Sequence, residues 1–177
     1  VLALGVTTVA ADENFPSPDW ADAYDPLSSP DAEIGGEISI YASQAPKSFN
    51  YYLDNNLFSN VLFSLLYPPL LDYNELEKAF DPGIVKSWTI GADQQTFTLR
   101  IDPDARWSDG RPITAEDVSW TYNMIVDPIN LTGVHKVGLE KFDPPEVLDR
   151  LTIQFRAKEV HWRNLVALAF VRPMPKH

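Results

Sequence analysis

The sequence predicts a fold of the α+β class, with mixed or antiparallel strands and packed helices, on three observations. Residues 96–101 and 151–156 alternate apolar and polar side chains, which is the period of a strand with one buried face. Residues 56–67 and 114–126 space their apolar side chains three and four apart, as amphipathic helices do. Ser108-Asp109-Gly110 is a turn signal between one strand and the helix that follows it.

Composition limits the classes of function. The chain has 177 residues, which suits one domain or a little more, and 45% of them are hydrophobic, which is enough for a core. A net charge of −11 argues against a nucleic-acid partner and against an anionic membrane surface. The absence of cysteine excludes disulfides, thiol catalysis, cysteine metal sites and the lipid-modified cysteine of a lipoprotein.

The first third of the chain is expected to contain little regular structure. Residues 1–11 are small and apolar, and we interpret them as a signal-peptide remnant with Val9-Ala10-Ala11 as its cleavage site. An ordinary buried element is the alternative. Residues 12–34 are acidic and rich in proline and serine, which predicts an extended or disordered leader. Alternation around Ile38 predicts a strand within residues 35–45.

A helix is expected over residues 56–67. Asn55 or Asn56 is placed to cap its first turn, and Pro68 ends it because proline lacks the N–H that would continue the helix. The large share of apolar residues predicts burial on more than one face. These residues are Leu57, Phe58, Val61, Leu62 and Leu65.

The clearest local signals lie in residues 96–118. Phe97, Leu99 and Ile101 are expected to face the core, and Gly110 is free to take a positive φ in the turn. Thr114 is predicted to cap the next helix, with Asp117 completing a capping box three residues later. That helix is expected to bury the face formed by Val118, Tyr122 and Ile125.

The remaining segments carry weaker signals. Residues 72–92 are predicted as a loop-rich connector with a short turn that ends at Trp88, and residues 130–145 as irregular chain. Residues 161–171 are mostly apolar and are predicted to form a helix that Pro173 ends.

Residues 107–118 read Trp-Ser-Asp-Gly-Arg-Pro-Ile-Thr-Ala-Glu-Asp-Val, and this run resembles the signature of family 5 of the extracytoplasmic solute-binding proteins. These proteins serve ABC importers of oligopeptides and dipeptides. Residues 67–71, 81–88 and 174–177 are also similar to segments of that family, although Lys86 stands where glutamate is usual. The residues that carry the motif are Trp88, Trp107, Ser108, Asp109, Gly110, Pro112, Thr114 and Asp117.

The resemblance implies a partial first lobe of a two-lobed periplasmic-binding-protein-like fold, with the second lobe missing. An α+β subdomain is expected over residues 46–168. The strand in 35–45 and a return over 169–177 would belong to the core of that lobe. By the same resemblance, residues Asn55, Asn56 and Leu57 fall where the family contacts its ligand.

The function implied by the resemblance is binding without turnover. It implies a soluble periplasmic protein that captures peptides, delivers them to the membrane permease of an ABC importer, needs no cofactor, and is a monomer at full length. A sensor or binding domain for another small solute, such as a nickel chelate, is the first alternative.

A secreted hydrolase of peptides or glycans is the second alternative, because five carboxylates lie close in sequence. Paired carboxylates with separated pKa values would be needed for such chemistry. Local roles in turns and helix caps account for the same residues, so no catalytic residue is assigned. The five are Asp102, Asp104, Asp109, Glu116 and Asp117.

Neither the histidines nor the tryptophans give a firm site. His135, His161 and His177 lack the spacing of a zinc motif, so no metal site is predicted. Four tryptophans could line a wall for a peptide or sugar, but core packing is the preferred interpretation for most of them. They are Trp88, Trp107, Trp120 and Trp162, of which Trp107 is the hardest to assign because it lies next to the turn.

Overall fold

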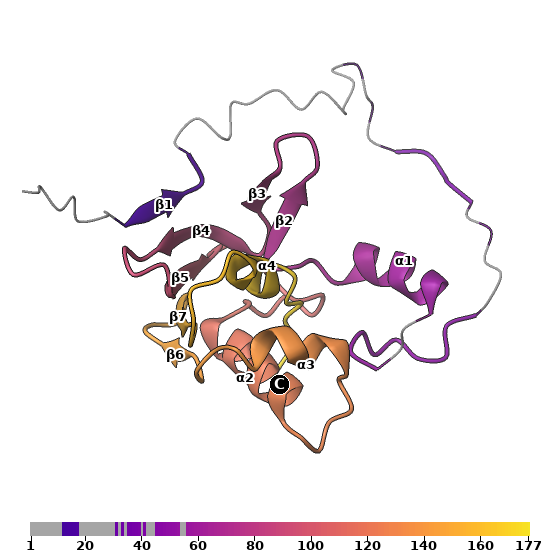
Figure 1. Cartoon of the computed structure of the whole chain (residues 1–177). Coiled ribbons are helices and arrows are strands. Elements are labelled where there is room, and N and C mark those ends of the chain that lie inside the picture. The colour runs from indigo at the N-terminus through magenta and orange to yellow at the C-terminus, as the bar shows by residue number, and fades with distance from the viewer. Residues whose placement is uncertain are drawn as a thin grey trace, which may run out of the picture.

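The computed structural model of the chain describes residues 12–17, 31, 33, 35–39, 41, 45–53 and 56–177. Figure 1 shows a sheet with helices on one side of it, a separate two-stranded hairpin, and helix α1 beside this body. The strands are β1 (Glu13–Phe15), β2 (Leu71–Asn74), β3 (Ala79–Pro82), β4 (Val85–Ile90), β5 (Thr96–Ile101), β6 (Glu146–Val147) and β7 (Thr152–Arg156). The helices are α1 (Leu57–Leu66), α2 (Ala115–Val126), α3 (Val134–Leu139) and α4 (Arg163–Ala169).

The main sheet is antiparallel, with the strand order β1-β4-β5-β7-β6. Its central strand is β5, which pairs with β4 on one side and with β7 on the other. Phe97, Leu99 and Ile101 are buried, as their alternation predicts, and Ile153 and Phe155 on β7 are buried beside them. The strands predicted at 96–101 and 151–156 are therefore confirmed, and with them the α+β class.

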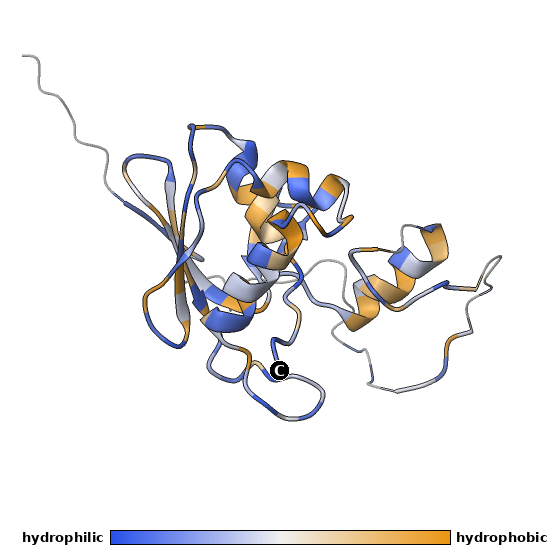
Figure 2. Cartoon of the chain, turned by 90° about the horizontal axis from the view of Figure 1, so that it is seen from below, coloured by the Kyte–Doolittle hydropathy of each residue, from blue (hydrophilic) through white to orange (hydrophobic). Residues whose placement is uncertain are grey.

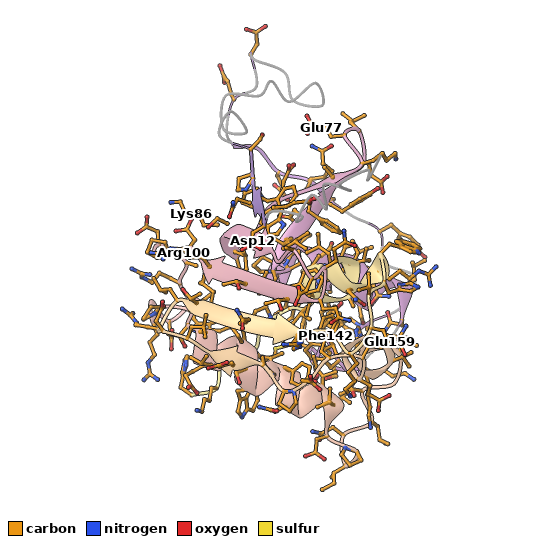
Figure 3. The ribbon with its side chains drawn as sticks, turned by 60° about the vertical axis from the view of Figure 1, so that its left-hand side comes forward. Asp12, Glu77, Lys86, Arg100, Phe142 and Glu159 are labelled. Carbon is orange, nitrogen blue, oxygen red and sulfur yellow. The ribbon has the colours of Figure 1, made fainter. Side chains whose placement is uncertain are left out.

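The two faces of the sheet differ in polarity. Helix α2 covers the apolar face, where the rings of Tyr122 and Phe155 have centroids 5.9 Å apart. Phe142 packs between Phe97 and Phe155 and is almost completely buried. Figure 3 shows Lys86 and Arg100 together on the outside of the molecule, whereas Phe142 lies among the densely packed side chains.

The connector predicted over residues 72–92 is wrong, because this stretch forms strands β2, β3 and β4. β2 and β3 form a separate hairpin in which Leu71 pairs with Pro82. Strand β4 has a register shift between Val85 and Ser87, and this irregularity breaks the alternation by which a strand is recognised in sequence. Trp88 is buried in β4 and does not end a turn.

Residues 130–145, predicted as irregular, contain helix α3. Its N-cap is Gly133, which makes no side-chain capping bond, so the usual start signal is missing from the sequence. By contrast, the helix predicted within residues 161–171 is present as α4.

Helix α1 is confirmed within the predicted range, but the expected burial on more than one face is wrong: of the five apolar side chains named for it, three are exposed, and Phe58 and Leu62 are half-buried. Leu57 is 83% exposed and Leu65 is 72% exposed, whereas Ser59 and Phe63 are buried. The cause is the aromatic cluster around Phe63, whose ring lies 5.7 Å from that of Tyr51 and turns this side of the helix inward. Figure 2 shows hydrophobic residues along much of α1, which stands at the side of the main body.

The N-terminal segments differ in part from the expectation. Three residues of the predicted leader form β1, which pairs with the edge of β4 and stacks Phe15 on Trp88 at 5.6 Å. The described residues of the strand expected at 35–45 lie in no strand, and residues 35–39 are exposed. The signal-peptide prediction for residues 1–11 lies outside the described residues.

No helix in the described part of the chain combines the length and the apolar character that crossing a bilayer requires.

Candidate functional site

The turn at residues 107–111 is closed by its own backbone. The Trp107 N–H donates to the Arg111 carbonyl at 2.8 Å, and the Gly110 N–H donates to the Trp107 carbonyl at 2.9 Å. Gly110 has φ +84°, the left-handed conformation that its sequence position predicts. The Asp109 carboxylate accepts a hydrogen bond from the Arg111 N–H at 3.0 Å. That bond, with a smaller contribution from His177, holds the pKa of Asp109 below its ordinary value.

The start of α2 is a complete capping box. Thr114 Oγ1 accepts from the Asp117 N–H, and the Asp117 carboxylate accepts from the Thr114 N–H at 2.9 Å. The Thr114 hydroxyl also donates to the same carboxylate at 2.8 Å. Both residues therefore act as their spacing predicts, and Asp117 is buried within this arrangement.

The C-terminal segment, residues 171–177, lies against this capped turn. The Lys176 N–H donates to Asp117 Oδ1 at 3.0 Å, and the Met174 N–H donates to Thr121 Oγ1 at 2.8 Å. His177 Nε2 lies 2.9 Å from Asp109 Oδ2. Two segments that resemble the same family, residues 107–118 and 174–177, are thus in direct contact, although more than fifty residues separate Asp117 from Lys176 in the chain.

A groove of about 900 Å³ lies beside this contact. It is lined by the loop 48–53, the end of α1, the turn segment 106–113, α2 with the chain that follows it, and the C-terminal segment, with Ile84 in addition. Most of its walls are apolar or aromatic, which is typical of a ligand site. The aromatic and long apolar side chains include Phe49, Leu66, Trp107, Ile113, Trp120, Met124 and Met174.

Polar groups are few in the groove. Ser108, Asn50, Asn130 and Thr132 contribute polar side chains to its walls. Among the described residues that line the groove, Arg106 is the one that carries a full charge. The Nε1 atom of Trp107 is buried and has no hydrogen-bond partner among the residues that the structure describes.

The wall formed by loop 48–53 is held in place by an aromatic cluster. The Tyr52 hydroxyl donates to the Arg172 carbonyl at 2.7 Å and accepts from the Arg172 N–H, and burial raises the pKa of Tyr52. The His135 ring lies about 5 Å from the rings of both Tyr51 and Tyr52. Burial, together with the nearby Arg172 guanidinium, lowers the pKa of His135.

The motif residues named from the sequence fall into two groups. Trp107 and Ser108 line the groove, whereas Asp109, Gly110, Thr114 and Asp117 shape the turn and the helix start behind it. Pro112 forms an isolated bridge with Arg106 at the base of the same turn. Trp88 is a core residue of β4.

Of the three ligand contacts carried over from the family, Asn56 and Leu57 are not among the described residues that line the groove. Asn56 caps α1, where its Oδ1 accepts from the Ser59 N–H at 2.8 Å, and Leu57 points to solvent. Asn55 lies outside the described residues. Loop 48–53 lies just before them in the chain. Their role as ligand contacts stays a prediction.

Sequence reasoning missed most of the groove. Phe49 and Met124 had no local signal, because each reaches the groove from a different element. Trp120, one of the four tryptophans named from the sequence as a possible wall, does line the groove; it lies on α2 opposite the buried Val118 and Tyr122 face and is 38% exposed. Trp162 lies outside this groove.

The carboxylates of the acidic cluster bond to neighbouring backbone and side-chain groups, and they are not arranged as a catalytic pair. Asp109 and Asp117 accept the bonds described above, Glu116 pairs with Lys176 at 3.1 Å, and Asp102 accepts from the Asp104 N–H. Within the described ranges, no three His, Asp or Glu side chains come together in a way that could hold a metal ion.

Comparison with known proteins relates this arrangement to one family. Residues 79–177 match the family model of the bacterial extracellular solute-binding proteins, family 5 Middle. The periplasmic oligopeptide-binding protein OppA of Haemophilus influenzae is 34% identical over 92 residues, which are 51% of this chain and 17% of that protein. The nickel-binding periplasmic protein of Escherichia coli is 26% identical over 128 residues, which are 72% of this chain and 24% of that protein.

A solved structure gives the same result. The ABC transporter substrate binding protein CtaP of Listeria monocytogenes superposes with a TM-score of 0.66 and 26% identity, over 77% of this chain and 28% of that one. The chain thus spans less than a third of the length of each of these relatives.

The turn at Gly110 generates the first prediction. No atom lies within 4 Å of a Cβ added at Gly110, so a substitution there meets backbone strain and no steric clash. We expect Gly110→Val to lower the free energy of unfolding by about 1–3 kcal/mol. Gly110→Asn is the control, because asparagine tolerates positive φ and should cost less. Denaturant titration measures both; equal losses would contradict the strain argument.

Asp117 generates the second prediction. Asp117→Ala removes the acceptor of bonds from Thr114 and from Lys176, so it should cost about 1–3 kcal/mol of stability. Asp117→Asn, which keeps one carbonyl acceptor, should fall between the parent and the alanine variant. Glu116→Ala is the matched control, since it breaks an exposed ion pair with Lys176 and should change the melting temperature little. A melting temperature for Asp117→Ala equal to that of Glu116→Ala would show that the carboxylate is not structural.

His135 generates the third prediction. Its pKa is lower in the folded protein than in the unfolded chain, so the unfolded chain binds the extra proton first as the pH falls. Stability should therefore decrease as the pH falls below about 6.5, the ordinary histidine pKa. In His135→Phe, which retains a ring, this decrease should be smaller than in the parent. Urea titrations at pH 5 to 8 compare the two proteins; parallel pH profiles would exclude His135 as the cause.

Proposed function

The chain belongs to the bacterial extracellular solute-binding proteins of family 5, and from this we propose that it is part of the substrate-binding component of an ABC importer that captures peptides. The observation that carries the proposal is the groove beside the signature turn and the C-terminal segment, two of the stretches that resemble the family. Such a protein binds its solute outside the cytoplasm, delivers it to a membrane permease, and catalyses no reaction. A periplasmic location and a monomeric whole protein belong to the same proposal.

The chemistry of the groove supports a peptide as the solute. Aromatic and apolar walls accept side chains of different shapes, and the few hydroxyl and amide groups can bond to a peptide main chain directly or through water. Asn55, Asn56 and Leu57 follow the loop that lines the groove, and we propose them as additional contacts. The acidic residues nearby already have partners, which argues against a hydrolytic pair.

A nickel chelate is the second candidate, favoured by the nickel-binding relative in Escherichia coli, which matches a large share of this chain. A chelate brings its own ligands and needs few from the protein, so the lack of a metal-ligating cluster in the described residues does not count against it. Aromatic walls such as those formed by Trp107 and Trp120 could also cover an organic chelate.

One assay on the protein purified from its natural host separates these functions. We expect a pool of peptides of two to five residues to raise its melting temperature in proportion to the logarithm of peptide concentration, because ligand binds the folded state. Nickel with histidine should raise it much less. Mass spectrometry of the pool after incubation should show every peptide intact. Peptide cleavage, or a shift with the nickel chelate and none with peptides, would overturn the proposal.

A further inference from the structure

We propose that the chain has a second binding site, separate from the groove, for a small amine that carries one aromatic ring. The site is a cavity of about 320 Å³ between the β4–β5 turn, residues 91–95, and the segment that leads into α4. This volume is near the lower end of the range for small-molecule sites, so it suits one ring with a short side chain. None of the described residues that line this cavity also lines the groove, so the inference goes beyond the proposed function and does not depend on it.

Apolar side chains form the walls of the cavity from two sides. Ile90 and Phe97 contribute from the sheet, whereas Val160, Trp162 and Leu165 contribute from the segment before α4 and from α4 itself. Trp162 is 73% exposed and Val160 is 55% exposed, although both lie at the same cavity. An apolar ring placed between these walls would remove part of that surface from water, and this favours binding.

The indole of Trp162 is held by its two neighbours in the sequence. The His161 ring stacks on it with centroids 5.8 Å apart, and the Arg163 guanidinium lies 4.8 Å from the centroid of the indole ring. His161 Nδ1 also accepts a hydrogen bond from the Arg163 N–H at 3.0 Å, which fixes the orientation of the imidazole. An aromatic side chain that is ordered before the ligand arrives loses little conformational entropy on binding. The tryptophan that lies outside the groove is thus pre-organised to contact a ring.

Glu13 places a carboxylate at the end of an apolar row of the sheet. It pairs with Ile90 on β4, and Ile90 pairs with Phe97 on β5; cross-strand partners of this kind point to the same face. The Asp12 carboxylate accepts a hydrogen bond from the Ala92 N–H at 2.9 Å, which fixes the start of β1 against the β4–β5 turn. The Glu13 carboxylate is therefore held beside the apolar walls, where it can bind the ammonium group of a ligand whose ring they contact.

The β4–β5 turn forms a defined end of the cavity. Gln94, which lines it, has φ +53°, an uncommon value for a residue with a side chain and one that often accompanies a functional site. The Asp93 carboxylate accepts hydrogen bonds from the N–H groups of Gln95 and Thr96, so this nearby acid is used within the turn. Glu13 is the carboxylate among the described lining residues, and the net charge of −11 on the whole chain also favours a cationic ligand.

The test titrates the protein purified from its host with phenethylamine, phenethyl alcohol and phenylacetate, and measures binding by ligand-observed NMR. We expect saturable binding of the amine, about two- to fivefold tighter than that of the alcohol, which is the range of an exposed ion pair. Phenylacetate should bind most weakly, because its charge has the same sign as that of Glu13. The preference for the amine should shrink as salt is added.

Two variants and one control assign the effect to the cavity. In Glu13→Gln the preference for the amine over the alcohol should fall to about one, whereas in the control Glu159→Gln it should stay as in the parent. Glu159 lies next to Val160 in the chain but does not line the cavity. Trp162→Ala should weaken the binding of both compounds by about two- to tenfold, because an aromatic contact is lost. Neither Glu13→Gln nor Trp162→Ala should change the shift in melting temperature that peptides produce.

The contrary outcomes are distinct. The absence of saturable binding for all three compounds would overturn the site. Equal affinity for amine and alcohol in the parent, or tighter binding of phenylacetate, would overturn the assignment of an amine. If Glu13→Gln keeps the amine preference and only lowers the melting temperature, the carboxylate protects the edge of the sheet, as inward-pointing charges do, and holds no ligand. Peptide binding in the groove is measured separately, so its failure would overturn the proposed function and leave this site standing.

Discussion

The carboxylate of Asp117 is the contact on which the rest of the site depends. It is buried and accepts bonds from the Thr114 N–H, the Thr114 hydroxyl and the Lys176 N–H. A buried carboxylate is stable when its oxygens are satisfied by donors, so it fixes both the start of α2 and the path of the C-terminal segment. Those two segments form adjacent walls of the groove, and the Asp117 carboxylate joins them together with the bond from Met174 N–H to Thr121 Oγ1.

The sequence predicts those parts of the fold whose causes are local. The alternation of Phe97, Leu99 and Ile101 requires one buried face, the capping box requires residues three apart, and Gly110 requires only freedom at its own φ. All three are present in the structure. Each depends on a few neighbouring residues, and for that reason none needed knowledge of what packs against it.

The parts that could not be predicted depend on distant partners. Strand β4 contains an irregularity that the pairing with β5 tolerates, although it hides the alternation. Helix α1 carries apolar residues around most of its circumference, but the contact of Phe63 with Tyr51, which precedes the helix, places the Phe63 side inward. The burial of Phe63 and the exposure of Leu57 thus reflect tertiary packing that overrides the apolar pattern.

The groove shows why the family signature specifies a scaffold better than it specifies a ligand. The polar groups of the signature, on Asp109, Thr114 and Asp117, are used within the turn, the helix cap and the C-terminal contact. The surface left for a ligand comes from Trp107 and from residues outside the signature, such as Phe49, Trp120 and Arg106. A sequence that keeps the internal bonds and changes these lining residues would keep the same groove and change its chemistry. Selectivity therefore depends on the side chains that line the groove. Among the described lining residues, Arg106 supplies the one charged group.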